Sequence, residues 1–250
     1  MRVLAKSLAG ALLLNGAPDG YPLGHPVDGE QQIPRLAKAT REQVPESLCA
    51  FNDRGRAADA TSTGLHFFRD DEALLPILAR PAKYAPIFTA YRLVLTPDVT
   101  IGDGMPPWQR ARAVVMSRMA GVVWQAHGLT VVPTLRWRTK DDYDNVAAGI
   151  PEGGVVAVAS YGSRRDRESR SEYENGLRKM VQRLVPECVM VFGRTQGRVY
   201  ADLARRTEFI EYLPPTAQAR PVRRSKLTPG QHSLFDAAQL MDPGVPCSAP

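Results

Sequence analysis

The sequence predicts an α/β fold with a predominantly parallel sheet, either open or rolled into a barrel, followed by a flexible C-terminal tail. Apolar runs alternate with amphipathic stretches from Gly64 to Leu213, which is the pattern of repeated βα units. The apolar runs are continuous, as expected of strands that are covered on both faces. Hydrophobic residues make up 44% and charged residues 23% of the 250 residues, which excludes wholesale disorder and a coiled coil.

Local signals place each element in order. Prolines 76, 81 and 86 break the first helical stretch, Pro107 suits the first turn of a long helix, and Gly128 suits its C-terminal cap. The expected strands are 65–68, 92–95, 129–137, 154–160, 188–192 and 209–213, and the expected helices are 70–88, 107–127, 141–148, 172–184 and 198–206. These six strands are two fewer than an eight-stranded barrel needs, unless the N-terminal arm supplies further strands. An open sheet and a barrel therefore both remain possible.

Three parts of the chain differ in composition. Residues 1–64 form an N-terminal arm and loop region, rich in Gly and Pro between 15 and 34, that we expect to pack on the core. Residues 65–213 form the α/β domain. Residues 214–250 form a flexible basic tail, because their composition buries too little apolar surface to offset the entropy of ordering.

Apolar run length and cysteine usage indicate the compartment. The longest apolar runs are far shorter than the roughly 18 residues that a membrane helix needs, so no membrane span is expected. Cys49, Cys188 and Cys247 are too few and too scattered for a disulfide framework or a four-ligand zinc site. We therefore expect a cytoplasmic protein.

Positive charge is concentrated toward the C-terminus. The net charge is +6, and basic runs occur at Arg164 and Arg165 and again at Arg223, Arg224 and Lys226. Such runs attract phosphate backbones, so both are candidate DNA contacts. Acidic residues are interleaved with the first run, for which a solvated face with ordinary ion pairs is the alternative.

A short motif lies in the tail. Gln231, His232, Ser233, Leu234 and Phe235 resemble the clamp-binding peptide of bacterial replication and repair proteins, with His232 in the variable place. In such peptides the Leu-Phe pair enters an apolar cleft of the ring-shaped clamp, while the Gln amide bonds to backbone groups. The predicted partner is the bacterial sliding clamp. The alternative is that Leu234 and Phe235 dock back on the protein's own core.

Candidate catalytic side chains follow the expected strands. Asp70 and Asp71 come after the first strand, Asp98 after the second, Trp137 at the end of the third and Ser160 at the end of the fourth. The carboxyl ends of parallel strands meet at one edge, where three carboxylates could hold a divalent metal and Trp137 could stack on a base or sugar. The alternative is structural, with Asp70 and Asp71 capping a helix and Asp98 in a turn.

The sequence also resembles a family of small proteins from phages, plasmids and integrating elements, grouped as a domain of unknown function. The resemblance runs from about Ile33 to Tyr212. Its features fall on His66, Phe67, Asp70, Asp71, Pro97, Asp98, Trp124, Gln125, Gly128, Pro133, Trp137, Gly149, Pro151, Ser160 and Gly162. After Asp98 the family usually has Phe-Ser, where this chain has Val99 and Thr100. The resemblance implies an α/β fold and a mobile-element setting, and it names no reaction.

Two hypotheses of function follow. The first is a phage or plasmid protein that docks on the sliding clamp and acts in, or interferes with, DNA replication. The alternative is a metal-dependent enzyme that acts on a nucleotide or nucleic-acid phosphate at the ends of the strands.

Overall fold

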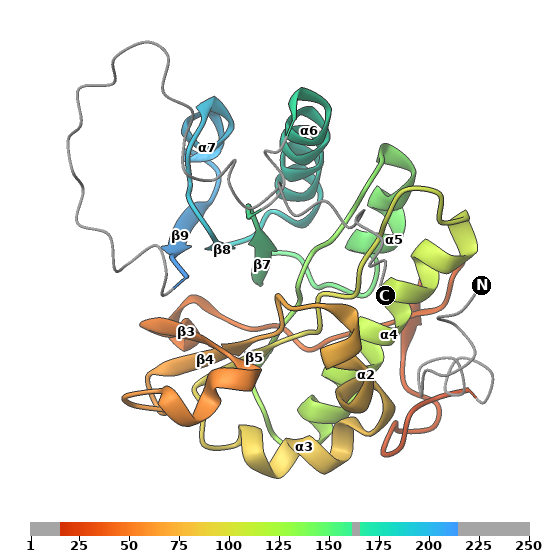
Figure 1. The fold of residues 1–250 in the computed structure, drawn as a ribbon. Coiled ribbons are helices and arrows are strands. Elements are labelled where there is room, and N and C mark those ends of the chain that lie inside the picture. The colour runs from red at the N-terminus through yellow and green to blue at the C-terminus, as the bar shows by residue number, and fades with distance from the viewer. Residues whose placement is uncertain (1–15, 162–165, 215–250) are drawn as a thin grey trace, which may run out of the picture. The chain divides into compact units, whose positions relative to one another are not determined.

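The computed structural model describes residues 16–161 and 166–214 of the chain, and its fold is α/β as the sequence predicts (Figure 1). The parallel strands form two groups. The first has the order β3 (Ser47–Ala50), β4 (Thr63–His66), β5 (Leu93–Leu95), β6 (Val131–Val132), and the second has the order β7 (Val155–Ala159), β8 (Cys188–Phe192), β9 (Glu208–Tyr212). A separate antiparallel pair, β1 (Val27–Asp28) and β2 (Ile33–Pro34), precedes them.

The two groups of strands continue into one another. Beyond β6, Thr134 forms a parallel bridge to Ala157 of β7, and the Ala157 amide donates to the Pro133 carbonyl at 2.9 Å. Pro133 has no amide hydrogen to donate, which accounts for the short β6 where the sequence predicts a strand over 129–137. The parallel strands therefore follow one another in chain order from β3 to β9.

Helices connect successive strands and cover their outer side. They are α2 (Asp71–Ala79), α3 (Pro81–Phe88), α4 (Pro107–Ala126), α5 (Tyr143–Ala147), α6 (Arg167–Leu184) and α7 (Arg198–Leu203), with 3-10 turns at Arg41–Gln43, Phe51–Arg56 and Lys140–Asp142. Figure 1 shows α2, α3 and α4 beside the first strands and α6 and α7 beside the last. The expected helix over 70–88 is two helices, because Pro81 starts a new one.

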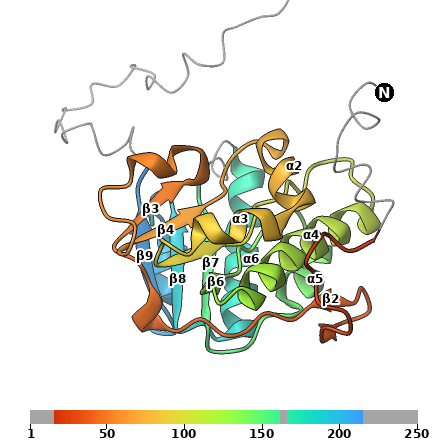
Figure 2. The ribbon, with the colours of Figure 1, turned by 90° about the horizontal axis from the view of Figure 1, so that it is seen from below.

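Strand residues face two sides in alternation, and this places an apolar core inside the curled strands. Val155 and Ala157 of β7 belong to the interior cluster, whereas Val156 and Val158 belong to an outer cluster with residues of α6. The buried members of the interior cluster are Ala39, Leu93, Leu95, Val132, Val155, Ala157, Cys188, Met190 and Tyr212. Because this cluster joins strands of both groups, the strands curl around it as in a barrel (Figure 2).

Side chains link the last strand to the segment before the first. The Tyr212 hydroxyl donates to the Pro45 carbonyl at 2.7 Å, and Arg41 pairs with Glu208 through contacts of 2.5 and 3.0 Å. No backbone ladder joins β3 to β9 among the residues described, so the barrel is incomplete there. The structure thus shows a barrel-like curl where the sequence left open sheet and barrel undecided.

The N-terminal arm contributes to this core. Its strand β3 pairs with β4, so the sheet begins before residue 65. The Gln125 amide of α4 bonds to both the Ala37 amide and the Ala37 carbonyl, at 2.8 and 3.0 Å. Gly149, at φ 73°, lies so close to the arm that a Cβ there would be 2.3 Å from the Pro34 oxygen. Within the part of the chain described, no helix is both long and apolar enough to span a membrane.

Candidate functional site

A cavity of about 380 Å³ opens where the chain leaves β5, β6 and β7. We name it the rim pocket. Its polar and aromatic lining includes Asp98, Asp103, Arg136, Trp137, Arg138, Tyr161, Ser169, Glu172 and Tyr173, and its apolar lining includes Ile101, Leu135 and Ala159. The lining therefore comes from the segment after β5, the exit of β6, the end of β7 and the first turns of α6. Chemistry commonly gathers at this edge of a parallel sheet.

Asp98 is the most buried carboxylate of the rim pocket, with 8% of its surface exposed. Its Oδ2 accepts a hydrogen bond from Arg136 Nη1 at 2.9 Å. Burial raises the pKa of Asp98 to about 6, against the opposing effect of the Arg136 charge, and the nearby Asp71 carboxylate raises it further. A carboxyl group with this pKa changes its protonation state close to neutral pH, so it can give or take a proton.

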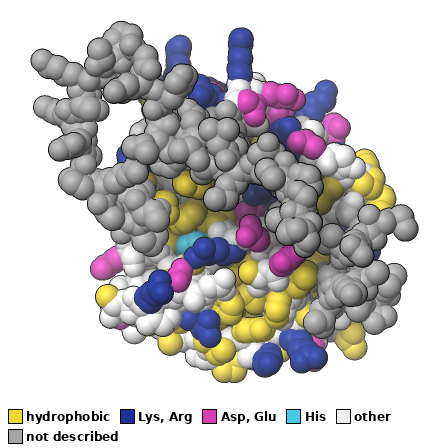
Figure 3. All heavy atoms as spheres, in the orientation of Figure 1, with side chains coloured by type: hydrophobic (Ala, Val, Ile, Leu, Met, Phe, Trp, Pro, Cys, Tyr) yellow, Lys and Arg dark blue, Asp and Glu magenta, His cyan; other side chains and the backbone are white. Residues whose placement is uncertain are grey.

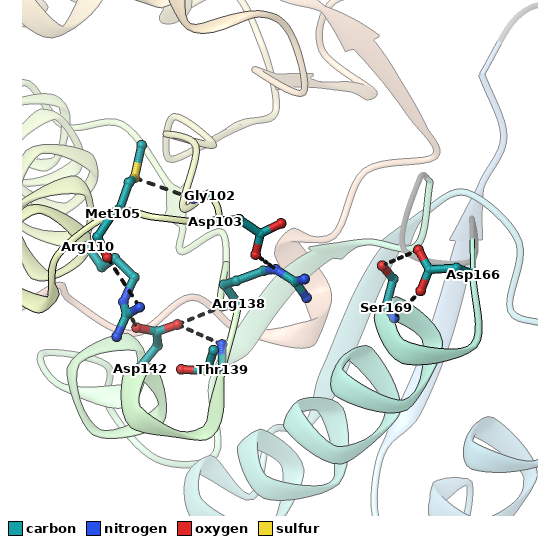
Figure 4. A network of polar contacts seen from close by, with 9 residues as sticks. All are labelled: Gly102, Asp103, Met105, Arg110, Arg138, Thr139, Asp142, Asp166 and Ser169. Atoms are coloured by element: carbon teal, nitrogen blue, oxygen red, sulfur yellow. Dashed lines mark hydrogen bonds and ion pairs between the residues drawn. The ribbon is translucent and has the colours of Figure 1, made fainter. Parts of the chain in front are cut away.

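Arg138 lies two residues after Arg136 in the segment that follows β6. Contacts hold both its guanidinium group and its backbone amide (Figure 4). Its Nε pairs with Asp103 Oδ1 at 2.5 Å, and the hydrogen bond and charge of Asp103 raise the pKa of Arg138. Its backbone amide donates to Asp142 Oδ2 at 2.8 Å, as does the amide of Thr139 at 2.9 Å. Asp142 in turn pairs with Arg110 of α4 at 2.8 Å, so the segment carrying Arg138 is tied to that helix.

Trp137 is packed beneath α6. Its ring stacks on Tyr173 at 5.8 Å between centroids, and its indole N–H donates to the Glu172 carbonyl at 3.1 Å. A Cβ at Gly176 would lie 2.0 Å from the indole nitrogen, so only glycine leaves room for the ring. One face of Trp137 is therefore occupied by the protein itself, which limits the stacking role expected from the sequence.

The residues that the sequence proposes as catalytic divide into two sets. Asp98 and Trp137 line the rim pocket, and Asp70, Asp71 and Ser160 do not. Asp70 is exposed at the N-cap position of α2 and makes no capping hydrogen bond. Asp71 accepts from the amide and hydroxyl of Thr100 at 3.1 and 3.0 Å, and the Ser160 hydroxyl donates to the Arg194 carbonyl at 3.0 Å.

The structure does not assemble the expected carboxylate metal site. Within residues 16–161 and 166–214, no group of three or more His, Cys, Asp or Glu side chains is placed to hold a metal ion. Asp98 and Asp103 are each paired with an arginine, and Asp71 is held by Thr100. The rim pocket is thus built from ion pairs and aromatic rings, with no cluster of metal-ligating carboxylates among the residues described.

Sequence reasoning missed much of the rim pocket. Arg136 and Arg138 flank Trp137 at the end of the expected third strand, and this shared position was the available signal that they reach the same edge. Ser169 was missed because α6 begins at Arg167, earlier than the expected residue 172, and Glu172 was expected only as the start of a helix. Asp166 caps this helix by accepting from the Ser169 amide at 2.7 Å, and an Asp at the N-cap position is a recognisable start signal.

His66 is a structural residue of the curled core. It is 4% exposed, and its ring lies 4.3 Å from Phe192 and 5.3 Å from Phe68. Burial, followed by the charge of Arg69, lowers the pKa of His66 to about 3, so the imidazole is neutral. On the face of the molecule shown in Figure 3, acidic and basic side chains of the described residues are interspersed and do not form a patch of one charge sign.

The remaining candidate residues lie outside the residues described. They are Arg164 and Arg165, the basic residues Arg223, Arg224 and Lys226, and the motif residues Gln231, His232, Ser233, Leu234 and Phe235. Their roles in DNA and clamp binding stay predictions from the sequence.

Comparison with known proteins identifies the family. Residues 25–213 match the family described as "Domain of unknown function (DUF4417)". A "Gene 1 protein" of Mycobacterium phage D29 is 34% identical over 189 residues, which cover 75% of this chain and 68% of the relative. A "Gene 1 protein" of Mycobacterium phage L5 is 32% identical over 185 residues, covering 71% and 81%. No solved structure matches the chain. The chain belongs to this family of unknown function, whose relatives include phage gene products.

Proposed function

We propose that the protein docks on the bacterial DNA sliding clamp through residues 231–235 and acts in, or interferes with, DNA replication. The observation that carries the proposal is the order of Gln231, Ser233, Leu234 and Phe235, which agrees with the clamp-binding pattern at every specified place. In the sequence, the motif lies C-terminal to β9, the last strand of the residues described. A short linear motif can bind a groove on a partner through its own consecutive residues.

The expected affinity is modest. Burial of a Leu and a Phe side chain contributes about 3 to 6 kcal/mol before the entropy of ordering the peptide is subtracted. Even before that subtraction, this free energy corresponds to a dissociation constant between about 40 μM and several millimolar, so binding in the tens of micromolar or weaker is expected. Such an affinity suits a tether that is gained and lost repeatedly.

Two further features support the proposal. Arg223, Arg224 and Lys226 precede the motif without acidic neighbours, and a clamp encircles DNA, so we propose that these residues contact its phosphates. Relatives encoded by mycobacteriophages agree with a role in processes that phages direct at their hosts.

The test uses the full chain over an immobilised bacterial clamp in surface plasmon resonance. The parent should bind with a dissociation constant of tens of micromolar or weaker, and the double substitution Leu234→Ala with Phe235→Ala should weaken binding by at least about 50-fold, because the apolar anchors are lost. Leu240→Ala, in the same segment but outside the motif, is the matched control and should bind like the parent. Equal binding of the double variant and the parent would show that the motif is not a clamp ligand.

A further inference from the structure

The rim pocket presents hydrogen-bond donors that the protein does not use. The ion pair with Asp98 occupies Nη1 of Arg136, and the ion pair with Asp103 occupies Nε of Arg138. In the part of the chain described, no partner meets the other guanidinium nitrogens of these two side chains. Two guanidinium groups at one cavity, each with N–H groups to spare, suit an anion with several acceptor oxygens, above all a phosphate.

An aromatic ring stands beside these donors. Tyr161 lines the same cavity and is 65% exposed. Among the residues described, no other ring packs against it, whereas Trp137 and Tyr173 already stack on each other. An exposed tyrosine next to a phosphate-binding group suits the stacking of a planar base.

Glu172 supplies the complementary acceptor. Its side chain lines the cavity from α6, and its carboxylate makes no hydrogen bond or ion pair with the described residues. A carboxylate accepts the N–H groups on the edge of a nucleobase, and guanine carries such donors side by side. The cavity volume of about 380 Å³ is at the small end of ligand pockets, which favours a single nucleotide unit over a longer segment of a polymer.

The balance of charge also selects the ligand. Asp98, Asp103 and Glu172 bring three carboxylates to the lining, against the two arginines. A bare anion meets repulsion from Glu172, and a bare cation meets repulsion from the arginines. A ligand with a phosphate at one end and N–H donors at the other matches both signs.

We propose that the rim pocket binds a nucleoside monophosphate unit, with its phosphate on Arg136 and Arg138, its base on Tyr161 and its N–H donors directed to Glu172. This site is separate from clamp docking and does not depend on it. A free nucleotide and the 5′-phosphorylated end of a DNA strand share this chemistry, and binding experiments distinguish the two sources.

The test is isothermal titration of the full chain with GMP, with guanosine and with a 5′-phosphorylated DNA tetranucleotide that begins with guanine. GMP should bind, and guanosine should bind at least about tenfold more weakly, because the arginine contacts are absent. Arg138→Gln and Tyr161→Ala should each weaken GMP binding by about fivefold or more, and Glu172→Gln should do so as well. Arg198→Gln, at an arginine on α7 whose side chain is 91% exposed, is the control and should bind like the parent.

Each outcome bears on the proposal. Tighter binding of GMP than of the tetranucleotide supports the site and identifies a free nucleotide, and the reverse order supports it and identifies a strand end. If neither phosphorylated probe binds the parent at millimolar concentration, the proposal is wrong. It is equally wrong if the Tyr161→Ala and Arg138→Gln variants, with parental melting temperatures, bind GMP as the parent does.

Discussion

The rim pocket and the C-terminal motif carry recognition chemistry in different forms. The motif is five consecutive residues, 231–235, C-terminal to the residues described. The rim pocket draws on the ends of β5, β6 and β7 and on α6, and its paired Asp98 and Arg136 are 38 positions apart. A substitution in the motif should therefore change binding without changing stability. A substitution around the rim pocket should change stability first and leave clamp binding intact.

Substitution of Arg118 should cause the largest loss of stability among the residues packed near the rim pocket. This fully buried arginine of α4 donates to the carbonyls of Thr134 and Val146 at 3.3 and 3.0 Å and has no carboxylate partner among the residues described. Burial lowers its pKa to about 10. Arg118→Ala should lower the free energy of unfolding by about 3 to 4 kcal/mol, since it leaves a cavity and two unpaired carbonyls.

Arg118→Met separates packing from hydrogen bonding. It keeps most of the side-chain volume and removes the buried charge, but it leaves the same two carbonyls unpaired, so it should cost about 1 to 2 kcal/mol less than Arg118→Ala. Urea unfolding of both variants gives the comparison, with clamp binding unchanged in each. Equal losses for Ala and Met would show that Arg118 acts through its hydrogen bonds and charge rather than through the volume it fills.

The stability of the protein should depend on pH through Asp98 of the rim pocket. Its pKa is about 6 in the folded protein and about 3.9 in the unfolded chain, so between these values the folded state binds the extra proton. Stability from this group is therefore greatest at low pH and is lost as the pH rises from about 4 to about 6. Relative to Asp98→Asn, the parent should lose about 2 to 3 kcal/mol of unfolding free energy over this range.

Unfolding measured at pH 4, 5, 6, 7 and 8 checks this. The difference between parent and Asp98→Asn should level off above pH 7. A constant difference from pH 4 to pH 8 would mean that Asp98 titrates as it does in water.

Gly176 tests the packing beneath α6. Gly176→Ala places a methyl group where the Trp137 indole nitrogen stands, 2.0 Å from the ideal Cβ, and the ring is held by Tyr173 and by its hydrogen bond. We expect a net loss of about 2 kcal/mol, after the helix propensity that alanine gains over glycine. Gly55→Ala, which meets nothing within 4 Å, is the control and should change stability by less than about 0.5 kcal/mol. Thermal melting that leaves Gly176→Ala unchanged would contradict the packing described for Trp137.

The basic residues before the motif carry the smallest expected effect. Changing Arg223, Arg224 and Lys226 together to Ala should leave the melting temperature unchanged, because these residues follow the last strand of the α/β domain, β9, in the sequence. It should flatten the salt dependence of DNA binding by up to about three counterions. Fluorescence anisotropy at several salt concentrations measures this slope. An unchanged slope would show that these residues do not contact DNA.

The sequence predicts elements that local residues mark, and it predicts less well the features that depend on tertiary packing. The long helix α4 was predictable because Pro107 and Gly128 mark its ends locally. Strand β3 was not, since Ser47–Ala50 is short, only partly buried and outside the βα alternation that begins at Gly64. The rim pocket was predictable only in part. Strand order brings Asp98 and Trp137 to one edge, but the pairing of Asp98 with Arg136 depends on tertiary packing.

The most direct measurement of the central claim is a competition between the peptide of residues 229–238 and the full chain for the bacterial clamp. If clamp binding resides in five consecutive residues, the peptide should displace the full chain with an affinity within about threefold of the chain's own, since no folded surface contributes. A peptide with Ala in place of Leu234 and Phe235 should not compete. Failure of the unchanged peptide to displace a bound chain would place clamp binding elsewhere in the chain and contradict the account.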